Sequence, residues 1–506
     1  MKEKKKKTTH RAASRFRIPA VAALLAAAAL LLYFGAGSGR FSGLSPAPEN
    51  APEERTTLNL WYTDESLSDF LAAAALDFSE EQGVRVIPRL VSGLEYLENI
   101  HEASLKTDMV PDVYILGNDS LEKAWLSGLA GKIRDEDYVC GENFPEAALS
   151  AVTCRGHLIG YPFYYETSAL VYNLTYLEEA AKEELQAEAD AKAGQEAMAA
   201  LEQGELPQEE GAGAEQEEAS VSEAEAAERT RKLIPQTIDE ILAFADGYNA
   251  PEQVQSVFSW DVSDLFYNYF FIGGHVDVGG PDGDDEGRID LCNEDAVRCL
   301  SAYQELTQFF SIDPEAVSYE GVTQDFLDGK LVFTIATTDI LSRLEEAVRD
   351  GSFPYEYGVS RVPDINEELT CRSLSVTSAV VVNGYGEKQE EANRFARYLT
   401  ETAAQKLYES TGKLPANRRI SLPDEQAAAF AEEYAASVPI PKMMATSNYW
   451  VQMEIAFTRA WNGEEVSAVL QELSEQILTQ TAGERVSEES SGPPQEETES
   501  REQTAE

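Results

Sequence analysis

The stretch YPFYYETSALVYN, residues Tyr161–Asn173, decides the fold of this chain. It begins with an aromatic–proline pair, places one carboxylate, Glu166, among three tyrosines, and continues into an apolar run that ends at Tyr172. A buried strand entered through a polar, aromatic segment suits a chain that crosses between two lobes beside a ligand. The alternative is an ordinary buried strand over Leu170–Tyr172, with the tyrosines packed at its start.

The N-terminus is strongly polarised. Residues 1–17 carry eight Lys and Arg side chains and the single acid Glu3, and the uncharged apolar run at 18–36 follows them. This run is close to the ~17–25 residues that a helix needs to span a bilayer. The basic flank predicts a cytoplasmic segment at 1–17, with all later residues outside the cell. The run is a transmembrane anchor or the h-region of a cleaved signal peptide; its length favours the anchor. The protein is therefore expected at the cell membrane with its binding domain extracellular, or secreted if the signal is cleaved.

Composition limits the possible classes of function. The 506 residues are enough for two to three domains, and the hydrophobic fraction of 43% can supply a core. The formal net charge of −50 disfavours nucleic acid as a partner. The five cysteines show no CxxC pair or metal-ligand spacing. Cys140–Cys154 is the pair to test for a disulfide, and scattered buried thiols are the alternative.

Strands and helices alternate after a Gly/Ser/Pro-rich linker at 37–56. Apolar periodicity predicts strands at 58–61, 84–90 and 111–116, separated by helices at 67–81, 94–105 and 121–127. This alternation predicts an α/β unit with a mainly parallel sheet. Ligands bind beyond the carboxyl ends of such strands, here at Trp61–Ser66 and Leu116–Ser120.

Two segments interrupt this plan. Residues 177–232 form an Ala/Glu-rich insertion, for which we predict charged helices broken near 204–213, or partial disorder. Residues 483–506 form a polar, acidic tail, which we expect to be disordered.

No catalytic or cofactor motif is present in the sequence. A GxSxG, HExxH or phosphate-loop motif is absent, so we expect neither catalysis nor a cofactor. The segment 282–293 has acidic residues near EF-hand spacing, but Asn293 stands where a calcium loop needs a bidentate Glu. We therefore predict no metal site but an acidic hairpin that leads into a strand at 289–291 and a helix N-capped by Asn293.

Several segments, in order, resemble the family 1 extracellular solute-binding proteins, the maltose-binding-protein-like subunits of sugar ABC importers. The matching segments are LNLWYTD (58–64), PDVYILGNDSLEKAWLSGLAGKI (111–133), YPFYYETSALVYN (161–173), DFLDGKLVFTIATTD (325–339) and IPKMMATSNYWVQMEIAFTRAW (440–461).

The resemblance implies a bilobal, periplasmic-binding-protein-like α/β fold, preceded here by the N-terminal transmembrane helix. Hinge strands near Glu166 and Ser375–Thr377 would join the two lobes. Lobe 1 would comprise 57–166 and 376–438. Lobe 2 would comprise 167–375 and 439–482, including the insertion at 177–232.

A sugar site needs aromatic faces for pyranose rings and carboxylate or amide oxygens for hydroxyl groups. The resemblance places Asp64 in the first binding loop, Asp119 after the third strand, Glu166 at the crossover and Trp450 at the C-terminal stacking position. The candidate ligand-binding residues are Asp64, Asp119, Glu166, Trp260, Asp264, Asp339, Trp450 and Glu454. Asp64 and Asp119 could instead be helix N-caps, and Trp450 could be core.

The chain departs from maltose binders at several of these positions. Leu116 and Ser120 replace an aromatic residue and an arginine around the Asp119 turn, while Asp339 and Glu454 replace a stacking residue and an arginine. The pocket is thus acid-rich, which casts doubt on maltose and makes a cationic or amino-sugar ligand conceivable.

The resemblance implies a monomeric, non-enzymatic, extracellular subunit of an ABC transporter that captures a small solute, foremost a carbohydrate or oligosaccharide. Its partners would be the permease transmembrane subunits and, through its N-terminal helix, the membrane. The alternative is a membrane-tethered sensor or regulatory module with the same fold, in which the insertion contacts a partner. A hydrolase with Glu166 and Asp119 as its acid pair is a third, remote alternative.

Overall fold

The computed structural model describes residues 56–106, 110–202, 222–444 and 448–490. From Thr57 onward the chain forms one compact unit. None of the helices described in these ranges is long and apolar enough to cross a membrane. The apolar run at 18–36, the basic segment before it and nearly all of the linker lie outside the described residues, so the predictions about them stay predictions.

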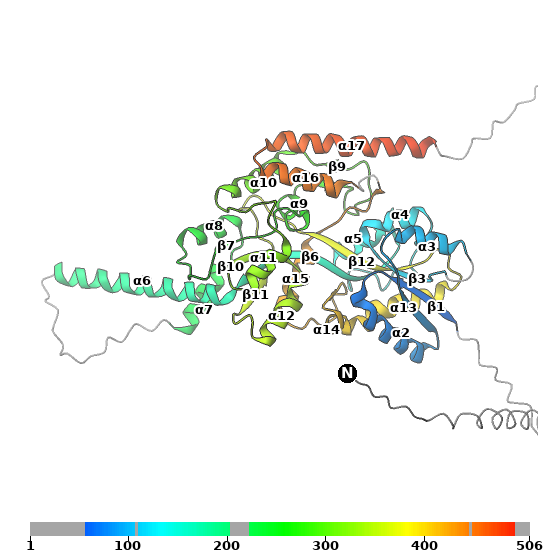
Figure 1. Ribbon diagram of the computed structural model, residues 1–506, viewed down its shortest axis with the longest axis horizontal. Coiled ribbons are helices and arrows are strands. Elements are labelled where there is room, and N and C mark those ends of the chain that lie inside the picture. Colours follow the sequence, from blue (N-terminus) through cyan, green and yellow to red (C-terminus); the bar gives the residue numbers. More distant parts are fainter. Residues whose placement is uncertain (1–55, 107–109, 203–221, 445–447, 491–506) are drawn as a thin grey trace, which may run out of the picture. The chain divides into compact units, whose positions relative to one another are not determined.

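The first three long strands form the expected parallel α/β unit (Figure 1). Strand β1 pairs in parallel with β2 along its whole length and with β3 on its other side. On α2, Phe70, Leu71, Ala74 and Phe78 are buried because the 3.6-residue period brings them to one face. These elements are β1 (Thr57–Tyr62), α2 (Ser68–Gln82), β2 (Arg85–Leu90), α3 (Tyr96–Ser104), β3 (Val113–Gly117) and α4 (Leu121–Leu126).

Strand β6 (Tyr161–Asn173) is the link between the two ends of the main sheet. Its first half pairs antiparallel with β12 (Leu374–Val382), up to Thr167. From Ser168 onward it pairs antiparallel with β10 (Leu331–Thr337), and from Leu170 also with β11 (Tyr357–Ser360). The main strand order is β2-β1-β3-β12-β6-β10-β7, with β7 at Ser256–Phe258. The hydrogen-bonded path is therefore continuous, and β6 changes partners midway.

The remaining helices pack around this sheet, and two of the remaining short strands extend it by pairing with β6 and β12. The helices are α5 (Glu146–Val152), α8 (Ile238–Gly247), α9 (Phe270–Gly273), α10 (Glu294–Glu305), α11 (Tyr319–Leu327), α12 (Ile340–Asp350), α13 (Gln389–Glu401), α14 (Leu407–Thr411), α15 (Glu425–Ala436) and α16 (Tyr449–Trp461). The short strands are β4 (Thr153–Cys154), β5 (His157–Leu158), β8 (Asp277–Val278), β9 (Ile289–Asp290), β13 (Leu414–Pro415) and β14 (Val438–Pro439).

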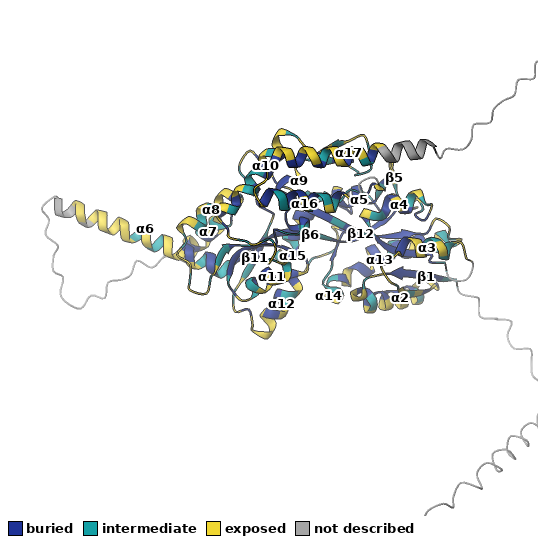
Figure 2. Cartoon of the chain, turned by 45° about the horizontal axis from the view of Figure 1, so that its top comes forward, coloured by how far each residue is buried: buried dark blue, intermediate teal, exposed yellow. Residues whose placement is uncertain are grey.

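The insertion is helical on both sides of its undescribed middle. Helix α6 (Leu174–Glu202) begins on the core and becomes exposed toward its far end (Figure 2). Helix α7 (Glu223–Leu233) packs back on α6, where Arg229 forms ion pairs of 2.9 Å with Glu184 and Glu188. The predicted charged helices are confirmed, while residues 203–221 lie outside the described ranges.

The structure tests three further predictions. The acidic segment at 282–293 is the expected hairpin: β8 pairs with β9, and the side chain of Asn293 N-caps α10. Helix α17 runs from Val466 to Ser490, so the start of the tail that we expected to be disordered is helical. All five cysteines are free thiols, and the disulfide suggested for Cys140–Cys154 is not formed.

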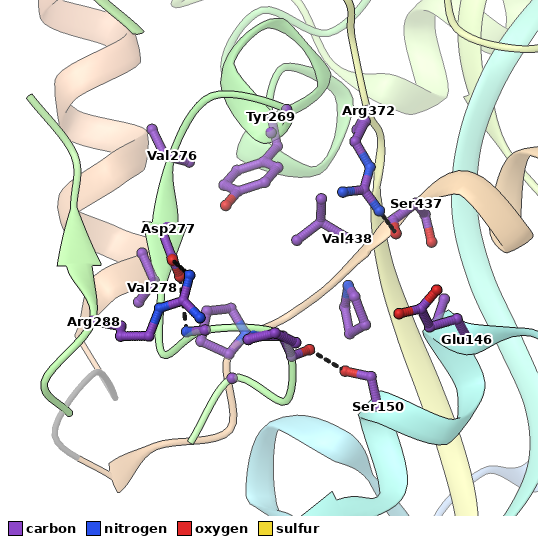
Figure 3. A pocket seen from close by; sticks show the side chains of 18 of the residues that line it. Glu146, Ser150, Tyr269, Val276, Asp277, Val278, Arg288, Arg372, Ser437 and Val438 are labelled. Carbon is purple, nitrogen blue, oxygen red and sulfur yellow. Dashed lines mark hydrogen bonds and ion pairs between the residues drawn. The ribbon is translucent and has the colours of Figure 1, made fainter. Parts of the chain in front are cut away.

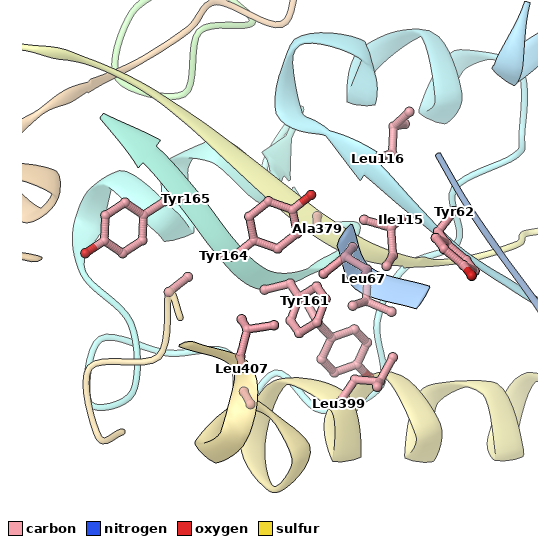
Figure 4. Packing of buried hydrophobic residues seen from close by; sticks show 14 of the residues in the cluster. Tyr62, Leu67, Ile115, Leu116, Tyr161, Tyr164, Tyr165, Ala379, Leu399 and Leu407 are labelled. Carbon is pink, nitrogen blue, oxygen red and sulfur yellow. The ribbon is translucent and has the colours of Figure 1, made fainter. Parts of the chain in front are cut away.

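Buried side chains form two clusters. The larger surrounds β1, β3 and the first half of β6, and includes Tyr161, Tyr165, Leu399 and Leu407 (Figure 4). It continues through α11 and α12, whereas the second cluster is formed around Phe258, α10 and α16. The clusters do not follow the predicted lobe boundaries, which stay predictions.

Candidate functional site

The two predicted hinge strands are direct neighbours. Val376 pairs with Glu166, and Thr377 pairs with Tyr165. Because side chains alternate between the two faces of a strand, these pairs point to opposite sides of the sheet. The ring of Tyr165 stacks on Tyr434 of α15 with centroids 3.8 Å apart, so α15 covers one face and Glu166 lies on the other.

Glu166 is the only residue of β6 that is not buried. Its carboxylate accepts a hydrogen bond of 3.0 Å from the hydroxyl of Thr338, in the turn after β10. Burial raises the pKa of Glu166, and the charge of Lys413 acts in the opposite direction. The carboxyl is therefore both partly exposed and partly desolvated.

Asp64 and Glu166 are brought together by a lysine that the sequence analysis did not identify. The Nζ atom of Lys413 lies 2.8 Å from Asp64 Oδ2 and 3.7 Å from Glu166 Oε1. It also lies 4.8 Å from the centre of the Tyr164 ring. Asp64 additionally N-caps a short 3-10 turn by accepting from the backbone N–H of Ser66, so the N-cap and site interpretations both apply to it.

Asp339 and Asp119 complete this face. The carboxylate of Asp339 accepts hydrogen bonds from the hydroxyls of Tyr319, at 2.7 Å, and Thr337, at 2.5 Å. Asp119 follows β3, and a Cβ on Gly117 would lie 2.5 Å from its Oδ1 and 3.9 Å from Val376. Glycine at 117 therefore leaves room for this carboxylate on the side of Val376 and Glu166.

The side chain of Asp119 is exposed, although desolvation raises its pKa. We call the group Asp64, Asp119, Glu166, Asp339 and Lys413 the acidic face.

Three of the other predicted residues form a second group. Trp450 and Glu454 lie one turn apart on α16, and the Trp450 ring is 6.2 Å from that of Phe266. Burial raises the pKa of Glu454, and the charge of Asp264 raises it further, so these two carboxyls lie near each other. Asp264 also N-caps the turn that carries Phe266, with a hydrogen bond of 2.8 Å to its N–H.

Aromatic and backbone contacts join this second group to the acidic face. Tyr267 stacks on Tyr319 with centroids 4.6 Å apart, and the Tyr319 hydroxyl donates to Asp339. On the crossover strand, the hydroxyl of Ser168 donates to the carbonyl of Phe266 at 3.3 Å. The structure thus connects six of the eight predicted residues along one path, and Asp119 lies directly after β3, the neighbour of β12 in the sheet.

Trp260 is the exception. Its side chain is fully buried, stacks on Phe258 at 4.5 Å and donates its indole N–H to Asn268 at 2.8 Å. An indole whose hydrogen bond is satisfied inside the core has no access to a solute. We therefore correct its assignment from ligand contact to core residue.

A separate cavity of about 390 Å³ contains none of the predicted residues (Figure 3). Its walls come from α5, the β8–β9 hairpin and the end of α15. Helix α15 covers the face of β6 that is opposite to Glu166. Its polar groups are largely paired with one another: Arg288 with Asp277 at 2.5 Å, and Arg372 with the carbonyl of Ser437 at 2.9 Å. Within the described residues, no cluster of three or more His, Cys, Asp or Glu side chains could hold a metal ion.

Comparisons with known proteins agree with the fold. The family model described as bacterial extracellular solute-binding protein matches residues 73–433. No curated protein matches the chain at a significant level.

Solved structures resemble the fold over most of the chain. An extracellular solute-binding protein from Staphylococcus aureus, solved with maltose, is 17% identical with a TM-score of 0.65 and covers 86% of this chain and 99% of its own. A cyclo/maltodextrin-binding protein solved with maltotetraose is 19% identical with a TM-score of 0.63, covering 85% and 98%. The maltose-binding protein from Listeria monocytogenes, solved with maltose, is 18% identical with a TM-score of 0.63, covering 85% and 98%. At these identities the similarity shows the fold and leaves the ligand open.

Proposed function

The chain belongs to the bacterial extracellular solute-binding protein family, and we propose that it delivers a carbohydrate or oligosaccharide to an ABC permease. The family is non-enzymatic, and its members bind solutes in association with ABC transporters. In our proposal, the solute binds in a cleft between lobe 1 (57–166 and 376–438) and lobe 2 (167–375 and 439–482), on the acidic face. The apolar run at 18–36 would tether the protein outside the cell.

The observation that carries this proposal is the convergence of acceptors and an aromatic ring on one connected surface. Asp64, Glu166 and Asp339 come from three separate elements, and each lies beyond a strand end or at the crossover. Carboxylates accept hydrogen bonds from sugar hydroxyls and compensate for the water that those hydroxyls lose. Trp450, which is half-buried, supplies an apolar ring face for the C–H groups of a pyranose. Closure of two lobes over a solute would then favour one conformation for docking on the permease.

A thermal-shift screen of the full chain in detergent tests this function. The screen uses maltose, maltotriose, cellotriose, amino sugars, polyamines and amino acids. A solute at a hundred times its dissociation constant adds about 2.7 kcal/mol of stability. We expect a sugar to raise the melting temperature, and Trp450→Ala and Asp119→Asn to reduce that shift.

Two control variants exclude general effects of the substitutions. Asp246→Asn changes an exposed acid on α8, and Phe309→Ala removes an aromatic ring that is 61% exposed. Both are expected to keep the full ligand shift. A sugar response that survives Trp450→Ala together with Asp119→Asn would place the site elsewhere. A chain that responds to no solute would favour a sensor or partner-binding role.

A further inference from the structure

Lys413 is held at the crossover by backbone structure on both sides. It follows Gly412, which ends α14 in the left-handed conformation with φ 72°. It precedes β13, whose Leu414 and Pro415 pair with Tyr165 and Tyr164 of β6. The lysine backbone is therefore fixed beside the strand that carries Glu166.

The ammonium group of Lys413 is shared by two carboxylates that come from distant parts of the chain. It forms the ion pairs of 2.8 Å with Asp64 and 3.7 Å with Glu166, and its side chain is 16% exposed. In the described part of the chain, these are the only ion pairs formed by the predicted site carboxylates. Burial lowers the pKa of Lys413, but the hydrogen bond to Asp64 and the surrounding negative groups raise it above its ordinary value, so the amine stays charged.

This charge changes which solutes suit the acidic face. Two carboxylates without a cation would repel each other and favour a ligand that brings a positive charge of its own. The Lys413 ammonium between them offsets one of the two negative charges, and both carboxylates remain hydrogen-bond acceptors. They can then bind the hydroxyls of an uncharged solute.

We propose that Lys413 is a specificity-determining residue, which shifts the preference of the acidic face from cationic solutes toward neutral, hydroxyl-rich ones. The inference rests on the proposed solute-binding function and narrows its substrate class. Lys413 acts as a positioning residue: it orients Asp64 and Glu166 for the solute and replaces the charge that a cationic ligand would carry.

The test compares two sugars that share the same linkage. Cellotriose and the β-1,4 trimer of glucosamine differ in that the second carries an ammonium group in place of each C2 hydroxyl. Dissociation constants of both are measured by calorimetry for the full-length wild type and for Lys413→Met. In the variant, the preference for the glucosamine trimer over cellotriose, given by the ratio of the two dissociation constants, is expected to rise ~10-fold or more. The reason is that the ligand ammonium replaces the missing charge.

Two further variants serve as controls. Lys413→Arg keeps the charge and should keep the wild-type ratio. Lys330→Met removes a lysine that bridges Asp325 at 2.9 Å and Asp328 at 2.7 Å away from the acidic face, so the ratio should not change. An unchanged ratio in Lys413→Met would overturn the inference, whatever the absolute affinities are.

A measurement without ligand separates this inference from the proposed function. Carboxyl titration of ¹³C-labelled protein should show higher pKa values for Asp64 and Glu166 in Lys413→Met than in the wild type, since Lys413 lowers both. Unchanged titration would also overturn the role of Lys413. If the wild type binds no sugar while the carboxyl pKa values do shift, the proposed function fails and the compensating role of Lys413 stands.

Discussion

Asn118 is expected to be one of the most sensitive single positions for stability. Its side chain is fully buried and lies directly after β3. Oδ1 accepts the backbone N–H of Thr377 at 2.9 Å, and Nδ2 donates to the carbonyl of Ile440 at 2.9 Å. Strand β3 ends at Gly117, which pairs with Ser378, so the Asn118 amide supplies the next hydrogen bond to β12 in place of a backbone carbonyl.

Asn118→Ala removes both of these hydrogen bonds at once. The N–H of Thr377 and the carbonyl of Ile440 would then be left unpaired in a largely buried place. Each such group costs about 1–3 kcal/mol, so the free energy of unfolding should fall by about 2–6 kcal/mol. Water entering the vacated space would move the loss toward the lower limit.

Urea denaturation of the full chain measures this loss as a lower midpoint at an unchanged slope. Asn366→Ala is the matched control, because its Oδ1 also accepts two backbone N–H groups, those of Glu368 and Leu369, in a more exposed turn. Water can replace those bonds, so the loss should be about 1 kcal/mol or less. A loss below about 1 kcal/mol for Asn118→Ala would refute the argument that this amide joins β3 to the later chain.

Two further predictions concern buried positions. Burial raises the pKa of Glu433, so the folded state holds this proton up to a higher pH than the unfolded state. Stability should fall as pH rises from about 4.5 through the raised value, and Glu433→Gln should flatten that slope in denaturation curves measured across pH. A Cβ at Gly273 would overlap the carbonyl oxygen of Arg372, so Gly273→Ala should lower stability by about 1–3 kcal/mol. Gly247→Ala, where a Cβ meets nothing within 4 Å, is the control and should not lower it; equal melting temperatures for the two variants would contradict the packing argument.

Local patterns were sufficient for much of the fold. Apolar periodicity located β1, α2 and β3, and the crossover strand Tyr161–Asn173 was recognised from its composition. Asn293 was correctly predicted as an N-cap, because that role depends on neighbours within three residues. These features are determined by interactions over short distances in the chain, so a single sequence reveals them.

Two residues show where local patterns fail. Trp260 stands in a segment with two acids, which is typical of a ligand loop, yet its ring is fully buried and packs against Phe310 and Trp461. Lys413 follows an ordinary helix-ending glycine, and nothing nearby indicates that it meets Asp64 and Glu166. Whether a side chain is in the core or in a recess depends on elements far away in the sequence.

By itself, the sequence determined the parallel α/β unit, the long strand Tyr161–Asn173 and the types of residue that a solute site needs. Only the tertiary structure decided which of them meet: the paired strands β6 and β12, the ammonium shared by two carboxylates, and the Asn118 amide that reaches Ile440, 322 positions away. The physical reason is that hydrogen bonds and ion pairs act over a few ångströms in space. Which residues become partners depends on how the strands are arranged in space, and the local spacing of residues does not reveal that arrangement.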